Sequence, residues 1–176
     1  MNFVSWAFVA LFLIVLTARL TIGRRSTEPA FVLVLVVASI GFYAWHIPVY
    51  IGILLLSSGI DYWAALWLAR LPPAARGRRR AVLGLSLCTN LGLLAFFKYA
   101  SFFLQVMRDV LGPALTSPLP PELALALPMG ISFYTFQSMS YTIDVYRGVL
   151  APIHRFWPFF LFVSFFPQLV AGPIVR

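Results

Sequence analysis

A stretch without a single formal charge, from Ala30 to Leu56, limits the folds open to this chain more than any other feature of the sequence. Long apolar runs recur along the sequence, and 61% of the 176 residues are hydrophobic while only 10% are charged. A soluble domain is about half apolar and about a quarter charged, so this chain is expected to lie in lipid. There the backbone must satisfy its own hydrogen bonds, in a helix bundle or a closed barrel. Barrel strands would be short alternating segments, so these continuous runs predict an all-α, polytopic transmembrane helix bundle.

Breaks between the apolar runs divide the chain into about six helices within one transmembrane domain, residues 1–176. Pro48 disfavours helix at the residue before it, so the uncharged stretch is predicted to turn there. The segment Arg70–Arg80 holds two prolines, a glycine and five arginines and is predicted to be a loop. The expected helices cover residues 3–22, 30–45, 49–69, 81–110, 123–146 and 156–170.

The net charge of +8 would suggest nucleic-acid binding in a soluble protein. Here the arginines flank apolar runs, as the positive-inside rule describes for cytoplasmic loops, so nucleic acid is not an expected partner. The rule predicts that the N-terminus and the far end lie outside and that loops 23–29, 70–80 and 147–155 lie in the cytoplasm. The segment Met1–Trp6 has no Lys or Arg, which favours a retained first helix over a cleaved signal peptide.

Two ionisable residues fall inside the expected spans, where charges are costly and often functional. Asp61 could contact a substrate or a proton, or it could join its helix to a neighbour through an ion pair or a hydrogen bond. Lys98 could extend to the outer interface along its apolar stem. Alternatively, it could bind the phosphate of an acyl carrier or a polysaccharide carboxylate.

The fifth expected helix carries a polar stripe on an otherwise apolar segment. Residues spaced three or four apart in a helix share a face. A second polar strip, next to this stripe, holds Thr135, Ser138 and Thr142. Such a face should point at the protein interior or at a wet cavity, although packing through interhelical hydrogen bonds would explain it equally well. The stripe comprises Gly130, Tyr134, Gln137, Tyr141, Asp144 and Gly148.

Residues typical of metal and nucleophile sites are scarce. His46 and His154 fall at turns or loops without a second ligand at metal-binding spacing, so no metal site is predicted. Cys88 is the only cysteine, which excludes an intrachain disulfide. No Gly-x-Ser-x-Gly elbow is present.

Three segments, Asn90–Tyr99, Leu127–Gly148 and Phe165–Ile174, together resemble the membrane-bound O-acyltransferase family. The likeness is nearest to its bacterial branch, which includes alginate O-acetyltransferase membrane subunits and D-alanyl transfer proteins of teichoic acids. The tract Phe42–Trp45 also fits that branch. The resemblance implies a multi-helix enzyme of the bacterial inner membrane with a tunnel. It would take an acyl group from a cytoplasmic thioester, acetyl-CoA or an acyl carrier protein, with no bound cofactor.

The resemblance further implies an acceptor on the far side of the membrane, with alginate-type polysaccharide acetylation expected and an extracytoplasmic partner protein. Candidate tunnel residues are then Tyr134, Gln137, Tyr141, Asp144, Lys98 and Asp61. The family's histidine lies beyond Arg176, so no catalytic residue is assigned and the chain is expected to be an inactive N-terminal portion. The alternatives are a transporter or flippase subunit, or a membrane scaffold without catalytic activity.

Overall fold

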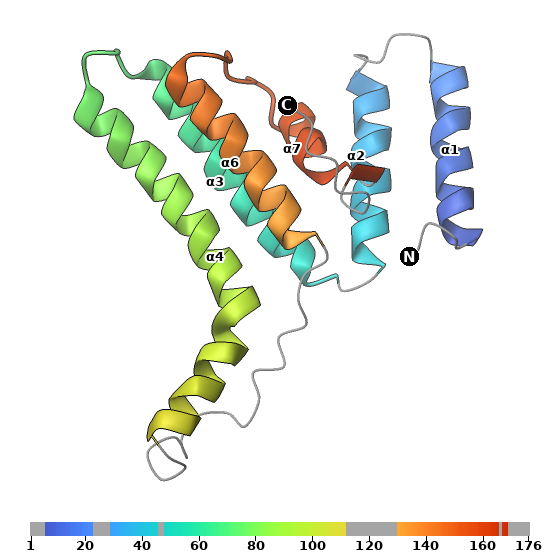
Figure 1. The fold of residues 1–176 in the computed structure, drawn as a ribbon. Helices are drawn as coiled ribbons and strands as arrows, with labels where there is room; N and C mark the ends of the chain where they lie inside the picture. Colours follow the sequence, from blue (N-terminus) through green and yellow to red (C-terminus); the bar gives the residue numbers. More distant parts are fainter. Residues whose placement is uncertain (1–5, 23–28, 46–47, 112–129, 166, 169–176) are drawn as a thin grey trace.

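The computed structural model describes residues 6–22, 29–45, 48–111, 130–165 and 167–168, and this part of the chain contains six helices and no strand. The expected all-α bundle is therefore confirmed (Figure 1). The helices are α1 (Trp6–Ile22), α2 (Pro29–Ala44), α3 (Tyr50–Arg70), α4 (Arg76–Leu111), α6 (Ile131–Arg147) and α7 (Phe156–Ser164).

Successive long helices run in alternating directions (Figure 1). Helix α6 packs against α3, α4 and α7, while α2 contacts α1, α3 and α7. The lower part of α4 projects away from this bundle (Figure 1). Because the helices alternate, the C-terminal ends of α3 and α6 and the N-terminal end of α4 meet at one end of the molecule.

Two helices, α3 and α4, are long and apolar enough to cross a membrane, and α1 and α2 are shorter apolar helices. Their outer faces carry large hydrophobic side chains, among them Trp63 and Trp67 of α3, which are 65% and 58% exposed. Such exposure suits lipid rather than water. The chain is a membrane protein.

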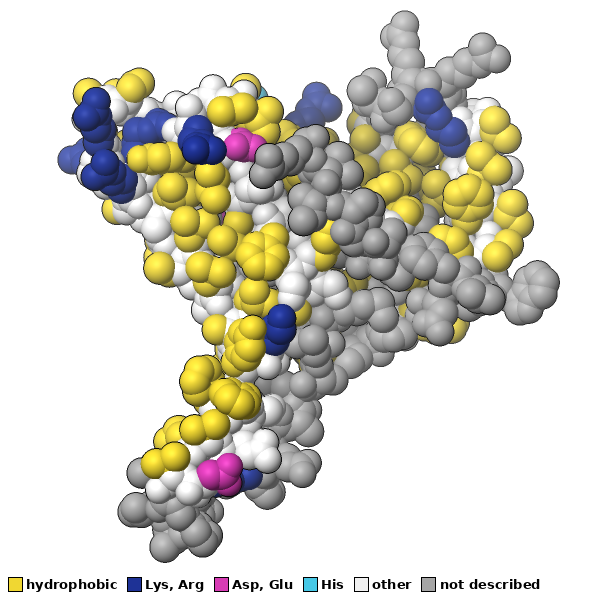
Figure 2. Space-filling view, viewed as in Figure 1, with side chains coloured by type: hydrophobic (Ala, Val, Ile, Leu, Met, Phe, Trp, Pro, Cys, Tyr) yellow, Lys and Arg dark blue, Asp and Glu magenta, His cyan; other side chains and the backbone are white. Residues whose placement is uncertain are grey.

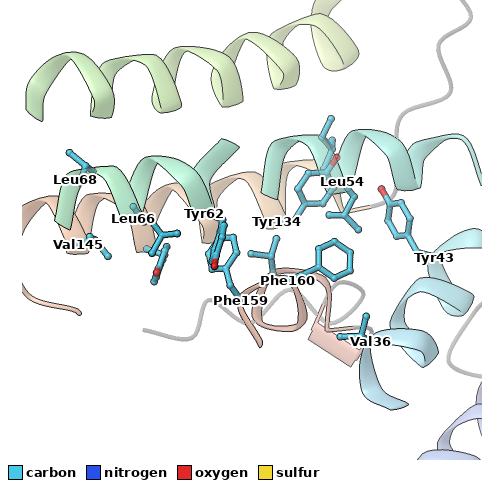
Figure 3. Close-up of a cluster of buried hydrophobic side chains, with 14 of the residues drawn as sticks. Val36, Tyr43, Leu54, Tyr62, Leu66, Leu68, Tyr134, Val145, Phe159 and Phe160 are labelled. Atoms are coloured by element: carbon cyan, nitrogen blue, oxygen red, sulfur yellow. The ribbon is translucent and has the colours of Figure 1, made fainter. Parts of the chain in front are cut away.

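Aromatic and aliphatic side chains of α2, α3, α6 and α7 form the main core (Figure 3). The ring of Phe159 in α7 lies 4.8 Å from that of Tyr141 and 5.8 Å from that of Tyr62, measured between centroids. The neighbouring Phe160 is also completely buried. The short helix α7 is thus anchored to α3 and α6 through its aromatic residues.

The fourth helix begins at Arg76, not at about residue 81 as expected, so the loop before it is only residues 71–75. Arginine is a good helix former, and the prolines that end α3 lie before this point. Within the first turns of α4, Arg79 donates hydrogen bonds from Nη1 to the carbonyl oxygens of Leu68 (2.6 Å) and Leu71 (3.1 Å). Its Nη2 donates to the carbonyl oxygen of Tyr146 at 2.7 Å.

Helix α6 begins at Ile131, so the fifth expected helix, residues 123–146, is not continuous across Gly130. Gly130 has a φ of 73°, a left-handed conformation that cannot continue a right-handed helix. Residues 123–129 lie outside the described part. Helix α7 ends at Ser164, whereas the expected last helix ran without a break to residue 170; Pro167 and Gln168 are again helical, and residues 169–170 lie outside the described part. Pro167 follows closely, and a proline disfavours helix at the residue before it.

Candidate functional site

Helix α6 is bounded by two glycines in the left-handed conformation. Gly130 precedes it and Gly148, with a φ of 75°, follows it. The Gly148 N–H donates to the carbonyl oxygens of Asp144 and Val145, and the Val149 N–H reaches Asp144 O at 2.9 Å. These bonds satisfy carbonyl groups that a helix end leaves unpaired. Both glycines therefore terminate the expected polar stripe instead of belonging to it.

The polar stripe of α6 faces the protein interior. Tyr134, Gln137 and Tyr141 are buried, whereas Asp144 is half-buried near the helix end. The adjacent strip is buried as well, so the inward polar face is broader than the stripe. It comprises Tyr134, Thr135, Gln137, Ser138, Tyr141 and Thr142.

Asp61 of α3 is completely buried and lies at the centre of a polar cluster that joins three helices. The Asn90 side-chain amide of α4 donates to both carboxylate oxygens, at 2.7 and 2.9 Å. The Ser86 hydroxyl, one turn earlier on α4, donates to the same carboxylate. The Ser138 hydroxyl of α6 interacts with it too. Among the described residues Asp61 forms no ion pair, so neutral donors alone stabilise it.

A second group of buried polar atoms lies nearer the other end of α6. The hydroxyls of Tyr43 (α2) and Tyr134 (α6) turn toward one another and interact (Figure 3). Neither has a hydrogen-bond partner of good geometry within the described part, nor do Ser58 Oγ and Gln137 Oε1. The Gln137 Nε2 atom donates to the Phe162 carbonyl oxygen at 2.7 Å. Buried polar atoms normally have partners, protein or water, so this region is suited to receive a polar group.

Tyrosine hydroxyls also fix the segment between α6 and α7. The Tyr141 hydroxyl accepts the Ile153 N–H at 2.8 Å, and the Tyr62 hydroxyl donates to the His154 carbonyl oxygen at 2.6 Å. The His154 side chain itself is exposed. No group of three possible metal ligands occurs in the described part, and His46 lies outside it.

Lys98 stands apart from the other candidate residues. It is exposed on α4, with its Nζ 5.6 Å from the ring centroid of Tyr99. The structure thus brings Asp61 together with the inward face of α6 and leaves Lys98 outside that arrangement.

Curated relatives can be aligned with this chain along most or all of its length. It is 38% identical over 147 residues to the probable alginate O-acetylase AlgI of Pseudomonas aeruginosa, covering 82% of this chain and 27% of that protein. The AlgI of Pseudomonas putida is 38% identical over 180 aligned positions, covering 100% of this chain and 35% of the relative. The chain belongs to the family of these bacterial O-acetyltransferases.

A third member of this O-acetyltransferase family has a different named acceptor. The peptidoglycan O-acetyltransferase of Helicobacter pylori is 35% identical over 166 residues, covering 81% of this chain and 30% of the relative. The chain therefore spans about a third of the length of the curated relatives it matches. No protein-family model and no solved structure matches it.

In this chain, sequence reasoning missed Ser86, Asn90, Tyr43 and Ser58 as partners of the candidate site. Ser86 and Asn90 are four residues apart in an apolar run, a spacing that places both on one helix face. That spacing could have identified them as partners for a buried carboxylate. No comparable pattern distinguishes Tyr43 or Ser58, because their burial depends on which helices pack together.

Proposed function

We propose that this protein is a membrane-bound O-acetyltransferase that transfers acetyl groups to the hydroxyls of an extracellular polysaccharide. The observation that carries this proposal is the similarity along the chain to proteins named alginate O-acetylase. Their names make an alginate-type polymer the first candidate acceptor. The peptidoglycan O-acetyltransferase among the relatives favours a cell-wall glycan as the second.

We further propose that the polar face of α6 lines or braces the path of the acyl group. Tyr134, Gln137 and Tyr141 are buried there, and Gln137 Oε1 and the Tyr134 hydroxyl lack partners of good geometry in the described part. Such atoms could bind a thioester or an acceptor hydroxyl by hydrogen bonding. Asp61, held by neutral donors, would brace the α3–α4–α6 contact next to this face.

The donor is proposed to be a cytoplasmic thioester, acetyl-CoA or an acyl carrier protein, with an extracytoplasmic partner protein receiving the acetyl group. The protein would be multi-pass in the bacterial inner membrane with its N-terminus outside. The basic residues at one end of the bundle support this orientation (Figure 2), because cytoplasmic loops are enriched in Lys and Arg.

The test uses the protein expressed from its native gene in a strain from which that gene has been deleted. Deletion should abolish O-acetyl esters on the exported polysaccharide, and the wild-type gene should restore them. Membranes from the restored strain should transfer label from an acetyl thioester. Unchanged ester content in the deletion strain would overturn the proposal. Transfer of label separates an enzyme from a transporter or a scaffold, since neither of these would transfer label.

The Gln137→Leu variant tests the role of α6 within this activity. It removes an amide while keeping a similar volume. We therefore expect the rate of acetyl transfer to fall about tenfold or more, which corresponds to an activation barrier about 1.4 kcal/mol higher. The control is Phe136→Leu, on the exposed side of the same helix. Normal transfer by Gln137→Leu at normal expression would contradict the proposed role.

A further inference from the structure

A cavity of about 490 Å³ lies at the basic end of the bundle, between the start of α4 and the end of α6. Four of its seven lining residues are arginines, namely Arg76, Arg79, Arg80 and Arg147. Figure 2 shows Lys and Arg side chains gathered at this end of the molecule. None of the described acidic side chains lines the cavity.

One of the four arginines already has partners and forms a fixed part of the cavity. Arg79 donates to three backbone carbonyl groups and lies 5.4 Å from the ring centroid of Tyr146. The other three differ, since Arg76, Arg80 and Arg147 are exposed and their guanidinium groups form no hydrogen bond or ion pair within the described part. Their guanidinium groups are therefore available to a ligand.

Figure 2 shows one acidic side chain beside the basic side chains at this end of the molecule. Asp144, one turn before the end of α6, is half-buried and does not line the cavity. Several like charges around one space repel one another, and an anion between them removes that repulsion. Guanidinium groups also match the geometry of phosphate oxygens, which they can bind with two parallel hydrogen bonds.

We propose that the cavity between α4 and α6 binds a phosphate group, with Arg76, Arg80 and Arg147 as its ligands. Two sources supply this chemistry at a membrane surface, the headgroup of an anionic phospholipid and the phosphate of a thioester donor. The second source rests on the proposed acetyltransferase function, whereas the first does not. If these arginines served only to set the orientation of the protein in the membrane, positive charge at this end would be enough, and the arginines would not need to surround one cavity.

The test measures binding, so it does not depend on acyl transfer. The protein expressed from its native gene is purified in neutral detergent and titrated with two probes. Phosphatidylglycerol is compared with phosphatidylcholine of the same acyl chains by native mass spectrometry, and coenzyme A binding is measured by equilibrium dialysis. We expect the wild type to bind phosphatidylglycerol or coenzyme A, with affinity falling as salt is raised.

The site variant is Arg76→Gln/Arg80→Gln/Arg147→Gln, and its matched control is Arg70→Gln/Arg78→Gln/Arg155→Gln. Both remove three exposed arginines from the same end, but none of the control residues lines the cavity. The site variant should bind the probe at least about tenfold more weakly, while the control should keep the wild-type affinity. Equal losses in both variants, or no binding of either probe by the wild type, would overturn the proposal.

A lysine version of the site variant keeps the charge, and with it the expected membrane orientation. The variant Arg76→Lys/Arg80→Lys/Arg147→Lys should retain binding at reduced affinity, because ammonium groups lack the two-pronged geometry. Preference for phosphatidylglycerol identifies a lipid headgroup, and preference for coenzyme A identifies the donor. Wild-type affinity in both the Gln and the Lys variants would place the phosphate elsewhere and refute the site.

Discussion

Arg79 positions its guanidinium group where the final carbonyl groups of two helices converge. The last carbonyl groups of a helix have no partner within it, and Arg79 supplies donors to those near the ends of both α3 and α6. The sequence alone predicted Arg79 only as one of five equivalent loop charges. Nothing in the run Arg76–Arg80 distinguishes it, because the difference comes from which carbonyl groups the fold brings within reach.

The Arg79→Lys variant tests this role at constant charge. A single ammonium group cannot replace the planar fork, so we expect a loss of about 1–3 kcal/mol in the free energy of unfolding. The measurement is equilibrium unfolding in mixed detergent micelles, followed by circular dichroism. Arg78→Lys serves as the control, and equal stability of the two variants would show that the three carbonyl contacts contribute little.

The helices combine features that the sequence predicts with contacts that it does not. Apolar runs, Pro48 and the Pro72–Pro73 pair were enough to predict the six helices of the described part and roughly where most of them begin and end. Which helices pack together was not predictable, because an apolar or polar face does not identify the neighbour that it contacts. The polar stripe of α6 was expected to face inward or toward a cavity, yet its contact with Asp61 through Ser138 required the three-dimensional arrangement.

The Asp61 cluster makes a prediction about the association of α3, α4 and α6. Asp61→Leu removes the acceptor of the Ser86 hydroxyl and leaves the Asn90 amide only its 3.1 Å hydrogen bond to the Ser86 carbonyl oxygen, so we expect it to destabilise the bundle by about 1–3 kcal/mol. Asp61→Asn should cost less, because its carbonyl oxygen can still accept a hydrogen bond and its amide can donate to Asn90 Oδ1, which has no partner among the described residues. Thermal unfolding in detergent ranks the variants, and a more stable Leu variant would argue against a structural role.

The glycines at the two ends of α6 lead to a further prediction for that helix. Gly148→Ala places a side chain in a left-handed conformation, at a cost of about 1–2 kcal/mol. Gly92→Ala, in the middle of α4 with nothing within 4 Å of the added carbon, should be neutral or stabilising by about 0.5–1 kcal/mol. The same unfolding assay compares them, and the reverse order would mean that Gly148 does not terminate the helix as described.

The whole molecule has a strongly basic end, where α3, α4 and α6 begin or finish (Figures 1 and 2). The described arginines at this end include Arg70, Arg76–Arg80 and Arg147, and the alternation of the helices accounts for their meeting there. Loop charges predicted that segments 70–80 and 147–155 lie on one side, and in the described part the arginines of these two segments do lie at one end. The sequence did not predict the projecting part of α4, since a continuous apolar run has the same pattern inside and outside a bundle.

The proposed orientation can be checked with a reporter that is active only outside the cytoplasm. Fused after Pro73, next to the arginine-rich start of α4, the reporter should be inactive. Fused after Pro48, at the opposite end of the bundle, it should be active. Activity after Pro73 together with silence after Pro48 would reverse the orientation.

The contact between Asp61 and Asn90 joins residues only 29 positions apart, within the single hairpin of α3 and α4. A chain is synthesised from its N-terminus, and its earlier parts can fold first. An aspartate at the centre of an isolated membrane helix costs about 2.5–3.5 kcal/mol on insertion scales. Because its amide partner leaves the ribosome soon afterwards, this carboxylate can enter the bilayer as half of a hydrogen-bonded hairpin, and α6 then arrives at a surface that is already assembled.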